Sequence, residues 1–427
     1  MALALFFVAF IVLIGLNCPI AFSMLLASFL YALVEGLPFS IVVERISGGL
    51  DSFPLVAIPL YVVAARIMNT GGITDRIFRM CLALIGHVRG GLAYVNVVSS
   101  MIFAGVSGSA MADVAGLGVT EIKAMKDDGY DAGYAAALTA ATCTVGPIIP
   151  PSVLLIIIGV MTETSIGRLF VGGIVPGVLL GVSIMILVYF DARNPRKGFP
   201  PPRPRLSAWA MWMAVQAGFL ALMAPVILLI AFFTGIVTPT EAGVIAVLYS
   251  MFVARVHGEL SLRNLYAALE DGVVATGMVM FIIATAQAFA WIVGTEQVAM
   301  AAFEAIRSFT NEKWVVLLLV NLLLLLMGCV IEGIAIVLVA VPVLLPIMKA
   351  IGVDPVHFGL FLTLNVMVGL ITPPVGIAVY IASNQAGVPV DVGLRKAIPF
   401  LVPLIATLLL VTYVPDTVLW LPRLLYP

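Results

Sequence analysis

Two interrupted apolar stretches carry the first residues that could do chemistry. One contains GPIIPPS at 146–152, and the other contains GLITPPVG at 369–376. A Pro-Pro pair removes two amide donors from a helix and crowds the carbonyls one turn earlier, which here run from Gly146 to Ile149 and from Gly369 to Thr372. Carbonyl oxygens turned inward at a broken helix bind a hard cation such as sodium, while the N-terminus of the next half-helix favours an anion. The alternative is that the prolines only kink helices for packing, since Pro and Gly are common in membrane helices.

A second interruption, rich in small or polar residues, precedes each break. VSGSAMAD occupies 106–113 and MGCVIEG occupies 327–333. The hydroxyls and flexible backbone of SGSA suit the tip of a re-entrant hairpin, although small residues also pack between membrane helices. Asp113 is the sharper signal, because an acid within an apolar segment is costly and by default indicates function; a cap at the membrane interface is the alternative. Glu332, beside Gly333, is its rough counterpart in the second half.

The last polar candidate is Asn365, which stands in an apolar run between LFLTL and VMVGL. Its amide either lines the site or bridges two packed helices. The residues at and beside the interruptions form the predicted substrate-contacting set, which is Asp113, Ser152, Glu332, Gly333, Asn365, Pro373 and Pro374. Two matched breaks imply two related sites.

The elements that position these residues are membrane helices. Of the 427 residues, 63% are hydrophobic and 10% are charged, whereas soluble globular proteins have about 45–50% and about 25%. Since about 20 apolar residues cross the hydrocarbon core once, the chain has room for roughly ten to twelve crossings. The N-terminal run MALALFFVAFIVLIGL lacks the basic segment and cleavage site of a signal peptide, so we expect it to remain as the first helix.

Composition and motifs also exclude several classes of function. The formal net charge of −1 leaves no basic face for a phosphate backbone, so nucleic acid is not an expected partner. The four cysteines lie singly in apolar surroundings and are expected to pack in the core. The three histidines lack metal-ligand spacing, and no nucleophile stands near a base, so neither an enzyme nor an organic cofactor is expected. Without a GxxxxGK[ST] loop the chain cannot use ATP by itself, which leaves coupling to an ion gradient.

The two halves of the sequence repeat each other. GPIIPPSVLLII at 146–157 aligns with GLITPPVGIAVY at 369–380, and the same offset of 223 positions puts Gly105 on Gly328. Secondary transporters are often built from inverted repeats whose broken helices meet near the midplane. We therefore predict a first repeat at 1–190 (hairpin near 100–115, broken helix near 146–152), a linker at 191–208, and a second repeat at 209–427 (hairpin near 327–337, broken helix near 369–376).

The linker predicts the orientation in the membrane. DARNPRKGFPPPRPR at 191–205 holds five basic residues and one acid, so the positive-inside rule places it in the cytoplasm. If each half crosses the membrane an odd number of times, the halves are inverted. Both chain termini are then expected in the periplasm.

Taken together, the motifs resemble the large membrane subunit of tripartite ATP-independent periplasmic (TRAP) transporters. The resemblance covers nearly the whole chain and rests on GLNCPIAFS, SFPLVAIPLYVVAARIMNTGGITDRI, the segment around SGSAMADVAGLG, GPIIPPS, LPIMKAIGVDPVHFG and NVMVGLITPPVG. It implies an all-α polytopic protein of the bacterial inner membrane, with a scaffold and a moving transport domain that contains two helical hairpins. It also implies a sodium-coupled elevator, a separate small four-helix membrane subunit, and a periplasmic substrate-binding protein.

The resemblance further implies where sodium ions bind. The first site would combine the first hairpin tip with carbonyls of the first break, namely Ser107, Gly108, Ser109, Gly146 and Ile149. The second would combine Gly328 with Gly369 and Thr372. The second hairpin departs from the family pattern, because Gly328-Cys-Val-Ile-Glu332-Gly stands where an aromatic residue and an Asp are expected. The role of Glu332 is therefore open.

These observations predict a sodium-coupled, binding-protein-dependent importer of small carboxylates, such as a C4-dicarboxylate, a keto acid or a sugar acid. A standalone sodium/anion or sodium/proton antiporter is the alternative within transport. A passive channel is a third possibility, although it would need a continuous polar lining, whereas the polar residues here gather at two breaks.

Overall fold

A computed structural model describes residues 1–235 and 237–426, and within these residues the chain is helical without any strand. The α-helices of the first half are α1 (Ala2–Gly15), α2 (Ile20–Val34), α3 (Phe39–Gly48), α4 (Ala57–Thr70), α5 (Ile73–Ile85), α6 (Gly91–Ser107), α7 (Ala110–Ala115), α8 (Leu117–Asp127), α9 (Ala132–Thr142), α10 (Val153–Thr162) and α11 (Ile166–Arg193). Those of the second half are α12 (Ala208–Thr234), α13 (Pro239–Val256), α14 (Leu262–Thr295), α15 (Val298–Phe309), α16 (Lys313–Gly328), α17 (Gly333–Ala350), α18 (Pro355–Gly369), α19 (Ile377–Ala386), α20 (Val390–Tyr413) and α21 (Asp416–Leu425). Short 3-10 turns include η2 (Cys143–Val145) and η3 (Pro195–Lys197).

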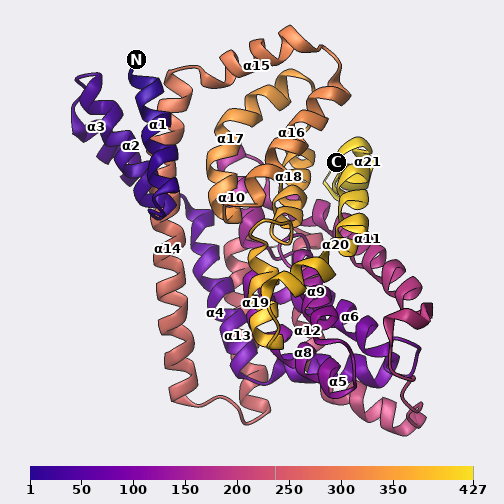
Figure 1. Cartoon of the computed structure of the whole chain (residues 1–427). Coiled ribbons are helices and arrows are strands. Elements are labelled where there is room, and N and C mark those ends of the chain that lie inside the picture. The colour runs from indigo at the N-terminus through magenta and orange to yellow at the C-terminus, as the bar shows by residue number, and fades with distance from the viewer. Residues whose placement is uncertain (236, 427) are drawn as a thin grey trace.

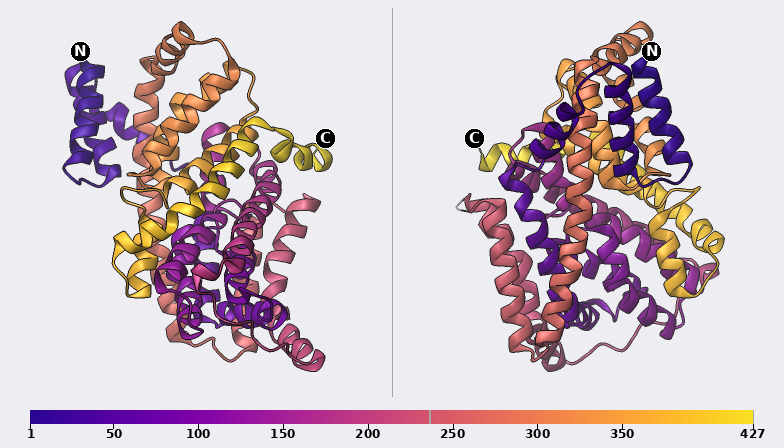
Figure 2. Two further views of the ribbon diagram at one scale, coloured as in Figure 1. Left: turned by 45° about the vertical axis from the view of Figure 1, so that its right-hand side comes forward. Right: turned by 90° about the vertical axis from the view of Figure 1, so that its left-hand side faces the viewer.

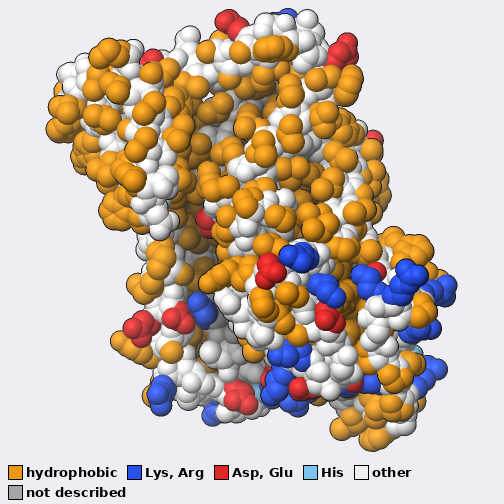
Figure 3. All heavy atoms as spheres, viewed as in Figure 1, with side chains coloured by type: hydrophobic (Ala, Val, Ile, Leu, Met, Phe, Trp, Pro, Cys, Tyr) orange, Lys and Arg blue, Asp and Glu red, His pale blue; other side chains and the backbone are white. Residues whose placement is uncertain are grey.

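Apolar helices, several of them long enough to cross a membrane, occur in both halves of the described chain. Seven segments are long and apolar enough to cross a bilayer, and a further seven apolar helices have 10–17 residues. The predicted all-α polytopic fold is confirmed. The shorter apolar helices have fewer than the ~20 residues that one straight crossing needs, so the number of ten to twelve crossings stays a prediction. Apolar side chains dominate the visible surface, and Lys and Arg gather over its lower end (Figure 3).

One group of helices forms a long wall, here called the frame group, and contains α1 to α4, α13 and α14. Figures 1 and 2 show α1 to α3 beside the upper part of α14 and α4 beside its lower part, and α13 packs on α4. The helix α14 has 34 residues, which gives a length of about 50 Å at 1.5 Å per residue. It is therefore longer than the ~30 Å hydrocarbon core.

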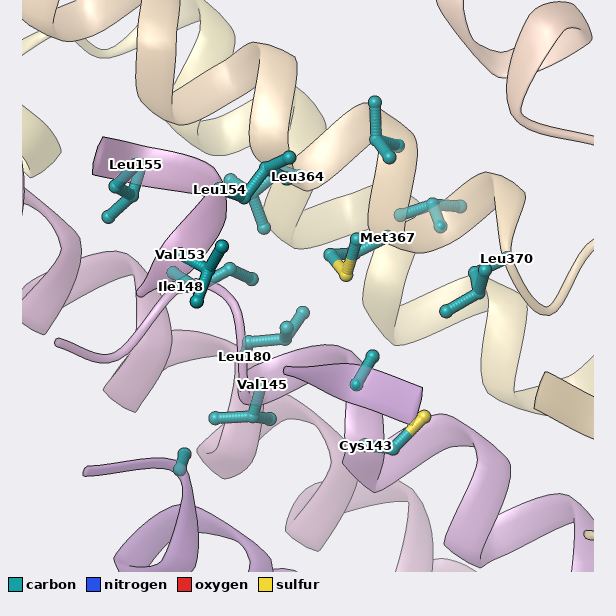
Figure 4. Close-up of a cluster of buried hydrophobic side chains, with 14 of the residues drawn as sticks. Cys143, Val145, Ile148, Val153, Leu154, Leu155, Leu180, Leu364, Met367 and Leu370 are labelled. Carbon is teal, nitrogen blue, oxygen red and sulfur yellow. The ribbon is translucent and has the colours of Figure 1, made fainter. Parts of the chain in front are cut away.

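The other group, here called the hairpin group, contains α6 to α11 and α16 to α20. Its helices pair across the two halves, since α9 packs on α19 and α20 and α10 packs on α17. Buried apolar side chains from both halves form one cluster, in which Leu154 of the first half is drawn next to Leu364 of the second (Figure 4). Each half of the sequence thus contributes helices to both groups.

The order of the elements recurs along the chain at the offset of the sequence repeat. The helices α9 and α18 begin at Ala132 and Pro355, which are 223 residues apart, and α8 and α17 end at Asp127 and Ala350, also 223 apart. Both Pro-Pro peptide bonds, Pro150-Pro151 and Pro373-Pro374, are cis. The inverted relation between the halves stays a prediction.

The basic linker is held against the hairpin group. The helix α11 continues to Arg193, three residues past the predicted repeat boundary, and α12 begins at Ala208. Between them, Arg203 pairs with Asp128 at 2.8 Å, and the ring of Phe199 lies 5.1 Å from that of Tyr134. These contacts fix the linker across the end of the molecule where Lys and Arg gather.

Candidate functional site

A cavity of about 700 Å³ lies where the frame group meets the hairpin group. Both hairpin tips line it, the first through Ser107, Gly108 and Ser109 and the second through Glu332 and Gly333. Frame helices α4 and α14 supply the opposite wall. Five predicted site residues that are far apart in sequence therefore share one cavity.

The first hairpin tip is a tight turn that contacts the first helix break, at 146–152. α6 ends at Ser107, and Gly108 adopts φ +59°, a conformation that glycine reaches without strain. A Cβ at this position would collide with the carbonyl oxygen of Pro151 and lie 3.1 Å from the Cα of Ser152. Only a glycine allows this close approach between the tip and the broken helix.

A buried carboxylate lies behind that tip. Asp113 is 2% exposed, and the Ser107 hydroxyl donates a hydrogen bond to one of its oxygens. Its other oxygen, Oδ2, has no hydrogen-bond partner in the described part of the chain, and it lies so close to Gly146 that a Cβ there would collide with it. The predicted substrate residue Asp113 therefore lies with the predicted ion-site residues and away from the cavity lining.

The carbonyls of the first break complete this group of oxygens. No described residue donates a hydrogen bond to the carbonyl oxygen of Gly146 or Ile149, whereas Pro147 O accepts one from the Ser152 hydroxyl at 2.6 Å. A buried carboxylate and free carbonyls without a cationic side chain beside them form an environment that a bound cation would stabilise. Ser152 itself is buried and also caps α10 by accepting from the Leu155 amide at 3.2 Å, so it does not line the cavity.

The second break brings its hairpin equally close to the broken helix. A Cβ on Gly328 would lie 2.9 Å from the Cα of Gly369, so these two backbones touch. The Thr372 hydroxyl donates to the carbonyl of Val368 at 2.7 Å, which leaves its oxygen lone pairs available. The three residues of the predicted second ion site therefore belong to two backbone segments in direct contact.

Three other predicted substrate residues lie away from the cavity. Pro373 and Pro374 are exposed on the surface of the second break, whereas the first Pro-Pro pair is buried. Asn365 is fully buried, and its amide donates to Asn321 Oδ1 at 2.5 Å and to the Phe361 carbonyl at 2.9 Å. Of the two readings of Asn365, the bridge between packed helices is the one the structure shows.

In the structure Glu332 caps a helix. Its carboxylate caps α17 by accepting from the amide of Ile334 at 3.2 Å. Ser109 caps α7 in the same way, accepting from Ala112 at 3.4 Å, and the two caps are 223 residues apart in the sequence. Glu332 thus occupies the place of Ser109 in the second hairpin and also presents its side chain at the cavity.

Sequence reasoning missed Arg66, which lines the cavity from α4. It is the only cation among the described residues of the lining. Its ion pair with Asp271 on α14 is long, at 3.7 Å, and both side chains are about half exposed, so the pair contributes little and leaves the guanidinium available. The sequence feature that could have identified Arg66 is its position as a lone charge inside the apolar run 54–68, because charges at membrane depth mark substrate pathways.

Polar groups beside Arg66 extend this end of the cavity. Thr74 donates to Asn69 Oδ1 at 2.8 Å, and Thr120 donates to Asp75 at 3.1 Å; all four residues line the cavity. The other walls are apolar and include Met367 and other side chains beside both breaks. The lining thus combines one guanidinium, hydroxyls and an amide with two carboxylates, Asp75 and Glu332. The guanidinium, hydroxyls and amide are groups that bind a small organic anion with polar substituents.

A second buried acid, Glu121 in α8, was also missed. It is 1% exposed and accepts from the Ser99 hydroxyl at 2.7 Å, while its Oε2 has no partner in the part of the chain that the structure describes. In the sequence it stands beside Lys123 and Lys126, a pattern typical of a solvated helix face. Nothing in the spacing predicted its burial.

Comparison with known proteins identifies the family. A family model described as the tripartite ATP-independent periplasmic transporter, DctM component, matches residues 7–417. The chain belongs to this family. Its members are named as permease subunits of TRAP transporters, so the protein is a transporter subunit and not an enzyme.

Similar TRAP permeases carry different substrate names. The chain is 39% identical to the sialic acid TRAP transporter large permease protein SiaM of Vibrio cholerae, over 95% of each chain. It is 36% identical to the sialic acid TRAP transporter permease protein SiaT of Haemophilus influenzae, over 98% of this chain and 68% of that one. It is 37% identical to the C4-dicarboxylate TRAP transporter large permease protein DctM of Pseudomonas aeruginosa, over 87% of each chain.

A solved structure supports the fold. The YdaH transporter of Alcanivorax borkumensis superposes with a TM-score of 0.60 at 17% identity, covering 90% of this chain and 89% of that one. At this identity the likeness concerns the arrangement of helices alone.

Proposed function

We propose that this TRAP permease subunit imports a small organic anion, such as a C4-dicarboxylate, a keto acid or a sugar acid, together with sodium ions. The observation that carries the proposal is the single cavity lined by both hairpin tips, with a buried carboxylate and free carbonyls directly behind the first tip. An importer driven by an ion gradient needs coupling between its ion sites and its substrate site, so that occupancy of one changes the affinity of the other. Sites that share one hairpin tip can be coupled directly.

We place one proposed sodium site at each of the two helix breaks. At the first, Asp113 and the hydroxyl of Ser107 join the carbonyls of Gly146 and Ile149; these are oxygen ligands, which a hard cation prefers. At the second, Gly328 and Thr372 stand beside Gly369. The first site has a carboxylate and the second has none, so we expect the first to bind sodium more tightly.

The proposed anion site lies in the cavity beside Arg66. A guanidinium can donate two parallel hydrogen bonds to one carboxylate, and this one is tied only by the long pair with Asp271. Sialic acid and C4-dicarboxylates, for which similar permeases are named, both carry carboxylates. Arg66 therefore supplies a recognition element common to that substrate class.

An elevator movement fits the division into two helix groups. The hairpin group carries both tips and both breaks, whereas the frame group supplies α4 and the long helix α14. Displacement of the hairpin group along α14 would carry the tips and their ions across the bilayer while the frame stays fixed. We propose that the frame is completed by a small four-helix membrane subunit, because the family is tripartite and the related SiaT chain is about half as long again as the matched region.

The remaining partner is a periplasmic binding protein that delivers the substrate. We place the protein in the bacterial inner membrane, with the basic linker in the cytoplasm and both termini in the periplasm. This orientation is supported by the Lys and Arg side chains that gather at the end of the molecule where the linker lies (Figure 3).

Reconstitution tests the proposal. The purified chain in liposomes with an inward sodium gradient should take up no organic acid. Addition of both the small subunit and the binding protein encoded in neighbouring reading frames should start uptake of the carboxylate that this binding protein carries, and either partner alone should not. If the lone chain transports carboxylates, or exchanges sodium for protons, at a rate the partners do not improve, the antiporter takes the place of the tripartite importer.

A further inference from the structure

A second groove, of about 580 Å³, lies on the outer surface where the turn between α5 and α6 meets the end of α11. It is separate from the transport cavity and shares no lining residue with it. Its wall includes two arginines and two tyrosines, which are Arg89, Arg193, Tyr94 and Tyr189. The proposed transport mechanism uses none of these residues.

The polar end of the groove carries unpaired positive charge. The guanidinium of Arg193 lies 4.1 Å from the ring centroid of Tyr189, so the ring holds it in place. In the ranges 1–235 and 237–426, no acid forms an ion pair with Arg89 or Arg193, and the nearby Asp191 pairs with Lys197 at 3.5 Å. Both arginines are exposed. They are therefore free to bind an anion.

The other end of the groove is apolar and lies deeper along the helices. Met185 precedes Arg193 by eight residues in α11, which is about 12 Å along the axis. Val98 follows Tyr94 by one turn in α6, and both apolar side chains line the groove. Because α11 runs on into the basic linker, the charged end lies at the membrane surface and the apolar end within the hydrocarbon.

We propose that this groove binds a phospholipid with an anionic headgroup, such as phosphatidylglycerol. The phosphate would lie between Arg89 and Arg193, with the tyrosine hydroxyls as further donors, and an acyl chain would cover Met185 and Val98. Basic pockets between transmembrane helices on the cytoplasmic side recognise lipid headgroups in this way. The occupant must be amphipathic, because a free phosphate ion would leave the apolar half of the groove unfilled.

Native mass spectrometry of the full-length chain in mild detergent tests the site with phosphatidylglycerol and phosphatidylcholine as probes. The wild type should retain phosphatidylglycerol in preference to phosphatidylcholine. The double variant Arg89→Gln/Arg193→Gln should bind phosphatidylglycerol at least about tenfold more weakly, since each basic residue near the surface contributes on the order of a fivefold effect. The matched control Arg196→Gln/Arg205→Gln removes the same charge from the linker outside the groove and should retain wild-type binding.

Three results would overturn the proposal. One is equal loss of lipid from both double variants, which would mean that overall charge alone attracts it. Another is a wild type that does not distinguish the two lipids. The third is displacement of phosphatidylglycerol from the wild type by millimolar inorganic phosphate, which would indicate an anion site without a lipid. Equal thermal stability of all variants in phosphatidylcholine nanodiscs controls for folding.

Discussion

Replacing Asp113 by Asn removes the only charge at the proposed first sodium site. Two opposite unit charges about 4 Å apart attract by about 4 kcal/mol at an effective dielectric constant of about 20. The Ser107 hydroxyl already stabilises the carboxylate by donating a hydrogen bond to it, and the amide oxygen of Asn can still serve as a ligand. We therefore expect about half of that attraction, near 2 kcal/mol, to be lost, which raises the sodium concentration for half-maximal binding by about thirtyfold.

The assay is the sodium-dependent rise in the melting temperature of the purified chain, because a ligand that binds only the folded state stabilises it. This measurement needs neither substrate nor partners. Glu332→Gln is the matched control, since Glu332 is an acid at the other hairpin tip whose carboxylate caps a helix. Its sodium dependence should match the wild type. The reasoning fails if Asp113→Asn keeps wild-type sodium dependence, or if both variants weaken it equally.

Three further predictions concern orientation, the second ion site and the anion site. Reporter fusions should place the linker at 191–205 in the cytoplasm and both termini in the periplasm, and a cytoplasmic C-terminus would contradict the inverted repeat. Thr372→Val keeps the side-chain shape but removes the hydroxyl oxygen, so it should raise the sodium concentration for half-maximal uptake several-fold; an unchanged sodium curve would exclude Thr372 as a ligand. Arg66→Gln should raise the KM for the carboxylate by tenfold or more, since a hydrogen bond to a charged group contributes about 1.5–3 kcal/mol. Asp271→Asn, which frees the same guanidinium, should leave the KM unchanged or lower it, and equal damage from both variants would mean that the Arg66–Asp271 pair is only structural.

The backbone features of the site could be predicted from the sequence, because they depend on residue types with strong local preferences. Gly108 and the Pro-Pro pairs fix where helices end, and the offset of 223 residues links the two breaks. In the structure α6 ends at Ser107 and α16 at Gly328, and no described helix includes either Pro-Pro pair. The direction of the side chains could not be predicted in the same way, because it depends on how a whole helix packs.

Asp113 and Arg66 illustrate that limit. Asp113 lies on the six-residue helix α7, and only the packing of the first hairpin on Gly146 determines that its carboxylate points away from the cavity. Arg66 stands out in the sequence as a charge within an apolar run, but its position in the cavity wall depends on how α4 packs against α13 and α14. Asn365 could not be assigned for a similar reason, since its partner Asn321 lies on another helix 44 residues earlier.

The central claim is that sodium binding drives carboxylate movement through the cavity between the two helix groups. The most direct measurement is uptake of the carboxylate by proteoliposomes that contain all three components, with an inward gradient of sodium in one sample and of potassium at equal concentration in the other. We predict concentrative uptake with sodium, its loss with potassium, and its strong reduction at the same sodium concentration in the Asp113→Asn variant. Equal uptake in the two gradients would contradict the account.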